Sequence, residues 1–280
     1  MSLADPPKHA SGPIQSPDPG PFADPLRIAA RLVWASIPGP ALDDEARTLI
    51  GTGIGGVVLF SKNVLDPAQL ARLCGEIRSV APGPIRISID QEGGPIIRIA
   101  EPLTRFPSPM AIGATRDPRI AYAVARASAR ELAALGIDVV LAPVLDLASD
   151  LRSAVVGARA YGSDPALVAR LGAAAVRGYL DGGVLPMPKH FPGHGRTPAD
   201  SHLAMPWVGG TLADLRARDL APYRAAIDAD APALMTAHVV HGAIDPGLPA
   251  TLSRAALVDL ARIELGFRGL LVTDALVMDA

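Results

Sequence analysis

Short apolar runs alternate with longer segments of helical period along the chain from residue 54 onward. The run GGVVLF (55–60) is apolar, with two adjacent valines, and predicts a buried strand. The segment that follows begins with Asp66 as a helix cap and Pro67 in the first turn, and its apolar residues recur on one helical face. A strand followed by a helix is therefore predicted, with an apolar helix face formed by Leu70, Leu73, Cys74 and Ile77.

The same order of strand and helix returns along the rest of the chain. The apolar runs do not alternate with polar residues, which is typical of parallel strands covered on both faces. The pattern thus predicts an α/β fold with a parallel sheet. The predicted strands cover 27–37, 55–60, 84–90, 137–144, 184–189, 231–238 and 269–274, and the predicted helices cover 66–80, 118–135, 165–181, 211–227 and 253–265.

Two parallel architectures fit this order, an open doubly wound sheet and a closed (β/α)8 barrel of the TIM type. No Gly-x-Gly-x-x-Gly pattern follows the first strand, which argues against a dinucleotide-binding open sheet. A barrel is favoured because it would gather around one mouth the polar residues at the carboxyl ends of the strands, and we expect a pocket there. Only seven strands precede Ala280, so the barrel is expected to be truncated after the seventh. The strand-end residues are Ser61, Asp90, Asp146, Lys189, His238 and Asp274.

Composition narrows the classes of function. The 280 residues are 49% hydrophobic and 19% charged, which is enough for one large core over 27–280. The formal net charge of -2 offers no basic excess for a phosphate backbone, so no nucleic acid partner is expected. Residues 1–26 hold seven prolines and predict a disordered leader. No apolar segment is long enough to span a membrane, and the expected location is cytoplasmic.

The stretch KHFPGHG (189–195) places a lysine and two histidines around a Phe-Pro-Gly turn. His190 and His194 are four residues apart, but Pro192 and Gly193 between them prevent the helix on which that spacing binds a metal. No metal and no cofactor are therefore predicted. A lysine and a histidine at a strand end can instead donate hydrogen bonds to substrate hydroxyls.

Acid and base chemistry is predicted for a carboxylate–imidazole pair and a further carboxylate. Asp200 would orient the ring of His202 and raise its pKa, leaving a histidine that gives and takes a proton near neutral pH. Asp274 ends an apolar strand, where a nucleophile or an electrostatic stabiliser would lie, although an aspartate there can equally cap the next helix.

Other polar residues are assigned more modest roles. Asp90 and Arg98, within DQEGGPIIR (90–98), suit the binding of sugar hydroxyls, and Glu92 between them is expected to brace the turn at 93–94. Pro186 and Pro188 each remove a hydrogen-bond donor from the strand before Lys189, which could shift that lysine. His194 is expected to shape the loop, and His238 and His241 to line the pocket or to finish a turn. Asp146 is expected to be a structural carboxylate at a strand end.

Together the stretches DQEGGPIIR, APVLDL, GARAYGSDP, KHFPGHGRTPADSH and VTDALVM resemble glycoside hydrolase family 3, in its bacterial β-N-acetylglucosaminidase branch. The Asp-x-His pair at 200–202 is the most specific part, because the β-glucosidase branch lacks it. The resemblance implies a retaining exo-hydrolase that removes terminal, non-reducing β-linked N-acetylglucosamine from muropeptides or chitooligosaccharides. A small carbohydrate is then the expected partner.

Residue roles follow from matching position in the family. The resemblance implies that Asp274 is the nucleophile and that His202, paired with Asp200, is the general acid/base. The residues expected to hold the sugar are Asp90, Arg98, Arg159, Lys189 and His190, although either arginine could instead brace a loop.

Two alternatives stay open. The first is a phosphorylase, because a neutral imidazole does not repel an incoming phosphate anion as a carboxylate would. A truncated, inactive remnant that only binds sugar is the other.

Overall fold

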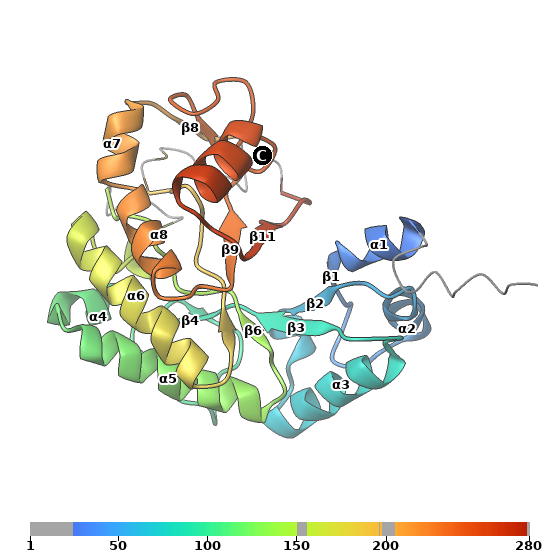
Figure 1. Cartoon of the computed structure of the whole chain (residues 1–280). Coiled ribbons are helices and arrows are strands. Elements are labelled where there is room, and N and C mark those ends of the chain that lie inside the picture. The colour runs from blue at the N-terminus through green and yellow to red at the C-terminus, as the bar shows by residue number, and fades with distance from the viewer. Residues whose placement is uncertain (1–24, 150–155, 196, 198–204, 279–280) are drawn as a thin grey trace, which may run out of the picture.

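The structure is a computed structural model that describes residues 25–149, 156–195, 197 and 205–278. Seven parallel strands follow one another in space in the order of the sequence, and the helices lie outside them (Figure 1). Five strands form one sheet in the order β1-β2-β3-β6-β7, and β9 pairs with β11. The strands are β1 (Trp34–Ser36), β2 (Gly56–Leu59), β3 (Arg86–Ile89), β6 (Val139–Val140), β7 (Leu185–Pro186), β9 (Ala233–Thr236) and β11 (Leu270–Thr273).

The two parallel sheets are joined just beyond β7. Phe191 forms a bridge with Thr236, and the amide of Met235 donates to the carbonyl of Pro188 at 3.0 Å. Two short pairs lie apart from this array. They are the antiparallel pair β4 (Gln91–Gly93) with β5 (Ile96–Ile97), and the parallel pair β8 (Trp207–Val208) with β10 (Val240–His241).

The longest helices begin where their capping residues predict. Asp66, Asp117 and Asp164 each accept a hydrogen bond from a backbone amide of the first turn, and each is followed by a proline at the first helical position. The α-helices are α1 (Pro25–Arg31), α2 (Asp44–Gly51), α3 (Pro67–Val80), α4 (Pro109–Thr115), α5 (Pro118–Ala134), α6 (Pro165–Asp181), α7 (Leu212–Ala217) and α8 (Leu220–Ile227). Three further helical segments are the 3-10 turns η1 (Ser61–Asn63) and η2 (Gly157–Arg159) and the π-helix η3 (Ala255–Glu264).

Alternate residues of each strand pack into different apolar clusters. Val57 and Leu59 face the helices, whereas Val58 between them joins a cluster on the inner side of the strands. Leu234 likewise packs against the helices, while Met235 faces inward. The strands are therefore buried on both faces, as their continuous apolar runs predict.

The sheet is not closed into a barrel. Among the described residues, no hydrogen-bonded pairing connects β11 to β1. Closure needs the last strand to bond to the first along its whole length, and each of these two strands is paired on one side only. The prediction of an α/β fold with a mostly parallel sheet is confirmed. The part of the chain that the structure describes holds no closed barrel, so a (β/α)8 barrel truncated after its seventh strand stays a prediction.

Two predicted elements are corrected. The first predicted strand, 27–37, begins as helix α1, and only Trp34–Ser36 is a strand. Pro25 begins this helix and the alanines within it favour it. The single helix predicted over 211–227 is two helices, because Pro222 has no amide to donate to the carbonyl of residue 218.

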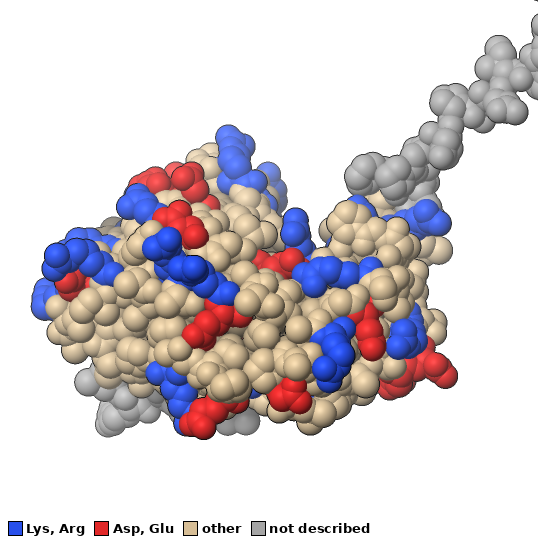
Figure 2. Space-filling model, turned by 90° about the horizontal axis from the view of Figure 1, so that it is seen from below, with Lys and Arg blue, Asp and Glu red and all other residues tan. Residues whose placement is uncertain are grey.

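The face of the molecule drawn in Figure 2 is not dominated by one sign of charge. In Figure 2, basic and acidic side chains are interspersed over the face seen from below. No described helix has both the length and the apolar character that a membrane crossing needs.

Candidate active site

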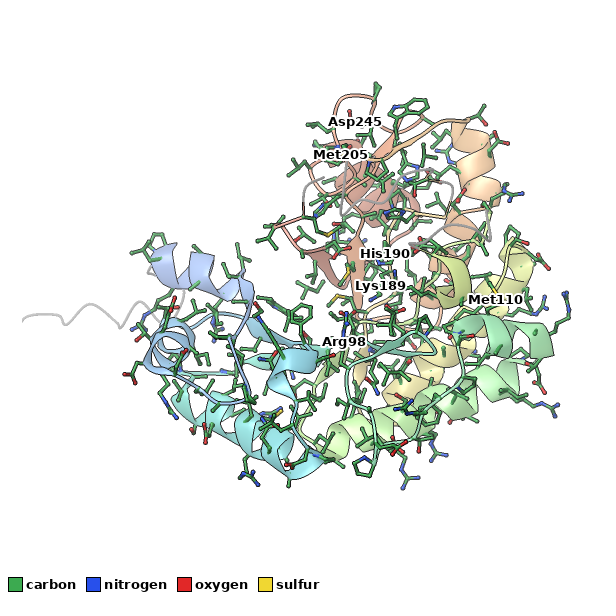
Figure 3. All side chains as sticks on the ribbon, turned by 180° about the vertical axis from the view of Figure 1, so that it is seen from behind. Arg98, Met110, Lys189, His190, Met205 and Asp245 are labelled. Carbon is green, nitrogen blue, oxygen red and sulfur yellow. The ribbon has the colours of Figure 1, made fainter. Side chains whose placement is uncertain are left out.

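Charged side chains gather at the carboxyl ends of the parallel strands. Asp90 follows β3, Asp146 lies on the segment after β6, Lys189 follows β7 and Asp274 follows β11. Figure 3 shows Lys189, His190 and Arg98 close together near the centre of the molecule. Parallel strands bring their carboxyl ends to one edge, and the sequence order therefore places these residues together.

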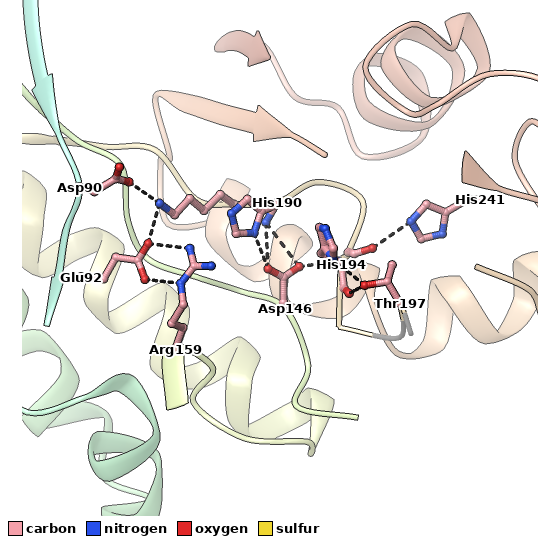
Figure 4. Close-up of polar contacts among 10 residues, drawn as sticks. Asp90, Glu92, Asp146, Arg159, His190, His194, Thr197 and His241 are labelled. Carbon is pink, nitrogen blue, oxygen red and sulfur yellow. Dashed lines mark hydrogen bonds and ion pairs between the residues drawn. The ribbon is translucent and has the colours of Figure 1, made fainter. Parts of the chain in front are cut away.

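Asp90, Glu92 and Arg159 belong to a buried ion network (Figure 4), and Lys189 lies at its centre. Its Nζ atom is 2.6 Å from Asp90 Oδ1 and 2.7 Å from Glu92 Oε1. Arg159 holds the same glutamate with two hydrogen bonds, from Nε to Oε2 and from Nη2 to Oε1, each 2.8 Å long. The side chains of Lys189 and Glu92 are only 3% and 1% exposed, so these charges are compensated by each other and not by water.

The network fixes the charge of its members. Burial alone raises the pKa of Glu92, but Lys189 and Arg159 outweigh this effect and lower it from 4.5 to about 2. Burial lowers the pKa of Lys189, but Asp90 and Glu92 outweigh it and the pKa is raised. A carboxylate and an ammonium therefore face each other at neutral pH.

Asp90 and Arg98 form the more open side of the network. Arg98 Nη2 is 3.6 Å from Asp90 Oδ2, and its guanidinium lies over the ring of Phe60, 5.8 Å from the ring centre. The side chains of Arg98 and Asp90 are 30% and 15% exposed. A ligand that reached this side would meet a carboxylate oxygen and a guanidinium next to each other, which suits a pair of vicinal hydroxyls.

The lysine is not displaced by the prolines before it. The amides of Leu185, Met187 and Lys189 all donate toward the segment 138–143. Pro186 and Pro188 fall on the alternate positions, where the missing donors would have faced β9, and Pro188 still accepts a hydrogen bond from Met235. The expected shift of Lys189 is therefore wrong.

His190 is hydrogen-bonded to a second buried carboxylate, Asp146. Nδ1 of His190 is 2.6 Å from Asp146 Oδ2, and the backbone amide of His194 donates to Asp146 Oδ1 at 2.6 Å. Burial raises the pKa of Asp146, but His190 and His194 outweigh it and the pKa is lowered. Asp146 is therefore an ionised carboxylate beneath the KHFPGHG loop, and not only the end of a strand.

The loop itself is packed tightly. Phe191 is fully buried and meets the ring of Tyr223 edge-on, with ring centres 5.3 Å apart. Gly193 has a φ of 134°, which favours glycine, and a side chain at Gly195 would strike the backbone of Leu147. The two glycines thus let the loop turn closely over neighbouring segments.

Two further histidines brace the site. His241 Nε2 donates to the carbonyl of Gly193 at 2.9 Å, and His238 Nε2 donates to the carbonyl of Ala275 at 3.1 Å. Thr197 accepts from His194 Nδ1 at 2.7 Å and donates to the carbonyl of His194 at 2.9 Å. The bond of His238 holds the residue after Asp274, and that of His241 holds the KHFPGHG loop.

Asp274 interacts electrostatically with basic side chains of the site. Burial raises its pKa, but His190, the Ala275 amide, Lys189 and His238 outweigh this effect and the pKa is lowered. Its amide donates to the carbonyl of Thr236 at 3.1 Å, which extends the pairing of β11 with β9. Asp274 is therefore an ionised carboxylate at a strand end, within electrostatic reach of Lys189, His190 and His238.

The sequence-predicted residues fall into two groups. The structure brings together Asp90, Arg98, Arg159, Lys189, His190 and Asp274. Asp200 and His202 lie outside the described residues.

One residue of the network was assigned a different role. Glu92 was expected to brace a turn, but it binds Lys189 and Arg159. Its spacing of two residues from Asp90 in an extended stretch, which puts both side chains on one side, is the signal that could have found it.

No group of His, Cys, Asp and Glu suited to a metal ion is found among the described residues.

A cavity of about 140 Å³ lies away from the charged network, lined by Arg27, Arg31 and the segments 51–54 and 81–84. These segments precede β2 and β3, so this cavity is at the amino ends of the strands.

The chain is similar to known glycosidases. A family model described as the glycosyl hydrolase family 3 N terminal domain matches residues 31–280. A beta-hexosaminidase of Thiobacillus denitrificans is 42% identical over 242 residues, which cover 84% of this chain and 67% of that protein. A beta-hexosaminidase of Neisseria meningitidis serogroup C is 38% identical over 260 residues, covering 90% and 72%.

Solved structures agree with the sequence comparison. A glycoside hydrolase family 3 beta-N-acetylglucosaminidase from Paenibacillus sp. superposes with a TM-score of 0.89 at 44% identity, covering 91% of this chain and 50% of that one. NagZ from Neisseria gonorrhoeae, in complex with N-trifluoroacetyl-D-glucosamine, gives 0.84 at 37% identity, covering 88% and 74%. This chain thus spans between half and three quarters of these similar structures.

Proposed function

The chain belongs to glycosyl hydrolase family 3, and we propose that this glycoside hydrolase is a retaining exo-β-N-acetylglucosaminidase. Its substrate would be a terminal, non-reducing β-linked N-acetylglucosamine of a muropeptide or a chitooligosaccharide. The observation that carries the proposal is Asp274, a carboxylate at the tip of β11 whose pKa is lowered by His190, the Ala275 amide and Lys189, so that it is ionised. A retaining glycosidase needs such a group as its nucleophile.

The ion network supports a sugar site next to that nucleophile. Asp90 accepts hydrogen bonds from hydroxyls and Arg98 donates to them, while Lys189 and Arg159 hold the carboxylates in place. Because the members are fixed before a ligand arrives, little ordering is needed on binding. The similar NagZ structure in complex with N-trifluoroacetyl-D-glucosamine supports a glucosamine derivative as the sugar.

The proposed reaction has two displacements at the anomeric carbon. In the first, an Asp274 oxygen attacks C1, the bond from C1 to the leaving oxygen breaks, and His202 gives its proton to that oxygen. In the second, water attacks C1, His202 takes a proton from the water, and the bond to Asp274 breaks. The product keeps the β configuration because C1 is inverted twice.

We also infer that the seven parallel strands are part of an eight-stranded (β/α) barrel. The strands follow one another in chain order, helices cover the outside, and one apolar cluster lies on the inner side. The edges of β1 and β11 are where one further strand would pair. A crystal structure of the protein would test this inference through what pairs with the open edges of those two strands.

Turnover of a chromogenic N-acetyl-β-glucosaminide tests the proposed function. We expect turnover by the chain, and a loss of about 10³-fold or more in kcat for Asp274→Asn, with the free energy of unfolding nearly unchanged. Asp245→Asn is the matched control, because among the described residues the side chain of this aspartate accepts hydrogen bonds from its own loop, from Ser253 and the amides of Gly247 and Leu248.

Product analysis tests the mechanism. NMR of the first product should show the β anomer, and a fluorinated inhibitor should label Asp274, detected by mass spectrometry of the peptide. An α anomer as first product would contradict a retaining hydrolase. A sugar 1-phosphate formed only with added phosphate would show a phosphorylase instead.

A further inference from the structure

Asp146 is a buried carboxylate whose hydrogen-bond partners, among the described residues, lie in the KHFPGHG loop. It is 1% exposed, and it accepts from His190 Nδ1 at 2.6 Å, from the amide of His194 at 2.6 Å and from the amide of His190 at 3.3 Å. No lysine or arginine is bonded to it in the part of the chain that the structure describes. The only ionisable side chain hydrogen-bonded to it there is the imidazole of His190.

These contacts decide which ring nitrogen of His190 carries a proton. An ionised carboxylate only accepts hydrogen bonds, so Nδ1 must donate. The neutral ring then has its lone pair on Nε2, which has no hydrogen-bond partner within the described residues. The ring also lies near enough to Asp274, the candidate nucleophile, to lower the pKa of that carboxylate when the ring is charged.

If Asp146 only held the loop in place, it would not need to be charged. Two backbone amides would be satisfied by a neutral asparagine oxygen, without the free-energy cost of burying an ionised group. One carboxylate oxygen of Asp146 accepts from Nδ1 of His190, and the other accepts from the amide of His194. Asparagine cannot do both, because it has one side-chain oxygen and its NH2 group only donates. The charge is therefore explained by the ring of His190.

We propose that Asp146 is a positioning residue that fixes His190 in the Nδ1-protonated tautomer and so directs Nε2 toward the sugar beside Asp274. The proposal rests on the proposed function, with His190 as the residue that contacts the sugar. A neutral Nε2 accepts a hydrogen bond from a sugar hydroxyl, and without Asp146 the same atom carries a proton and can no longer accept.

Nitrogen NMR of the ¹⁵N-histidine-labelled chain tests the tautomer directly. Spectra are recorded at a pH where the ring is neutral, and the His190 signals are assigned by their loss in His190→Gln. We expect the proton on Nδ1 in the unmodified chain and a shift of the population to Nε2 in Asp146→Asn, where the asparagine amide donates to Nδ1. A proton on Nε2 in the unmodified chain overturns the proposal, and this arm does not depend on turnover.

A double-mutant cycle tests whether Asp146 acts through His190. We expect Asp146→Asn to lower kcat/KM by about 10–100-fold in the unmodified chain, and by less than about twofold when His190→Gln is already present. An equal loss in both backgrounds overturns the proposal, because Asp146 would then act through the loop amides. Asp245→Asn again serves as the control.

The two arms separate this proposal from the proposed function. If the chain does not turn over an N-acetylglucosaminide, the proposed function fails, while the NMR result still decides the tautomer of His190. If turnover is present and the tautomer is the other one, the role of Asp146 fails and the proposed function stands.

Discussion

The two ends of the parallel strands carry ion pairs of different kinds. At the amino ends, Arg78 Nη2 is 3.0 Å from Asp138, with side chains 39% and 22% exposed. Arg78 also donates to the carbonyl of Gly136, and Asp138 accepts from the amide of Ile87. At the carboxyl ends, Lys189 and Glu92 bond other side chains and are almost wholly buried.

The difference indicates that the ion pair at the amino ends serves stability and that the network at the carboxyl ends serves binding. The Arg78 pair ends the β3–β6 ladder by satisfying backbone groups, at little desolvation cost. A buried ion network is a poor way to gain stability, because apolar residues of the same volume are often as good or better. The carboxyl-end network is therefore best explained by a need for fixed charges at a binding site, as in other α/β proteins whose sites lie at that end.

The largest expected effect is on stability, from Glu92→Gln. Loss of this carboxylate leaves Lys189 and Arg159 with one counter-charge fewer in a buried place, and the free energy of unfolding should fall by about 3–5 kcal/mol. Urea unfolding followed by circular dichroism measures it. The matched control is Glu264→Gln, because Arg216 holds Glu264 with two hydrogen bonds of 2.8 and 2.7 Å in an exposed position.

The control should lose about 1 kcal/mol or less, since exposed pairs contribute little. Equal losses for the two variants would mean that burial does not distinguish the carboxyl-end network from a surface pair.

The second prediction follows the pH dependence of the same glutamate. The pKa of Glu92 is about 2 in the folded chain against an ordinary 4.5, so its contribution is complete above about pH 4.5 and is lost as pH falls toward 2. Urea unfolding at a series of pH values should show the difference between the unmodified chain and Glu92→Gln shrinking by about 3 kcal/mol over that range. A constant difference would contradict the assignment.

The third prediction concerns activity. Asp90→Asn removes the carboxylate on the open side of the network, and kcat/KM for the chromogenic substrate should fall about 10–100-fold, because a hydrogen bond to a charged group contributes about 1.5–3 kcal/mol. Steady-state kinetics measure it. Asp181→Asn, which removes an exposed partner of Tyr122, should leave kcat/KM unchanged. If Asp90→Asn changed stability but not kcat/KM, Asp90 would be only a counter-ion of Lys189.

Local signals in the sequence predicted most of the fold. The caps Asp66 and Asp164 lie where they were expected, because a cap is decided by residues within one helical turn. The predicted strand over 27–37 failed in its first half, where an apolar run short enough for either element is helical. Pairing of the sheet edges depends on residues far apart in the chain and could not be read from local patterns.

The sequence predicted which residues lie at the site, but not which partner each of them contacts. Strand-end polar residues indicated Asp90 and Lys189, but their contact joins residues 99 apart in the chain. Arg159 and Glu92 are 67 apart, and His190 and Asp146 are 44 apart. Which carboxylate each cation binds is decided by how the loops pack, and for that reason Glu92 and Asp146 were assigned only structural roles.

The smallest effect is expected at the amino ends, from Arg78→Gln. The pair with Asp138 is partly exposed, so its loss should lower the free energy of unfolding by about 1 kcal/mol or less, measured by urea unfolding. The kcat/KM for the chromogenic substrate should stay unchanged, because β3 and β6 keep their pairing and the carboxyl-end network lies at their other end. A fall in kcat/KM as large as that of Asp90→Asn, with little loss of stability, would show that the charges at the two ends are coupled through these strands and that the division between them is wrong.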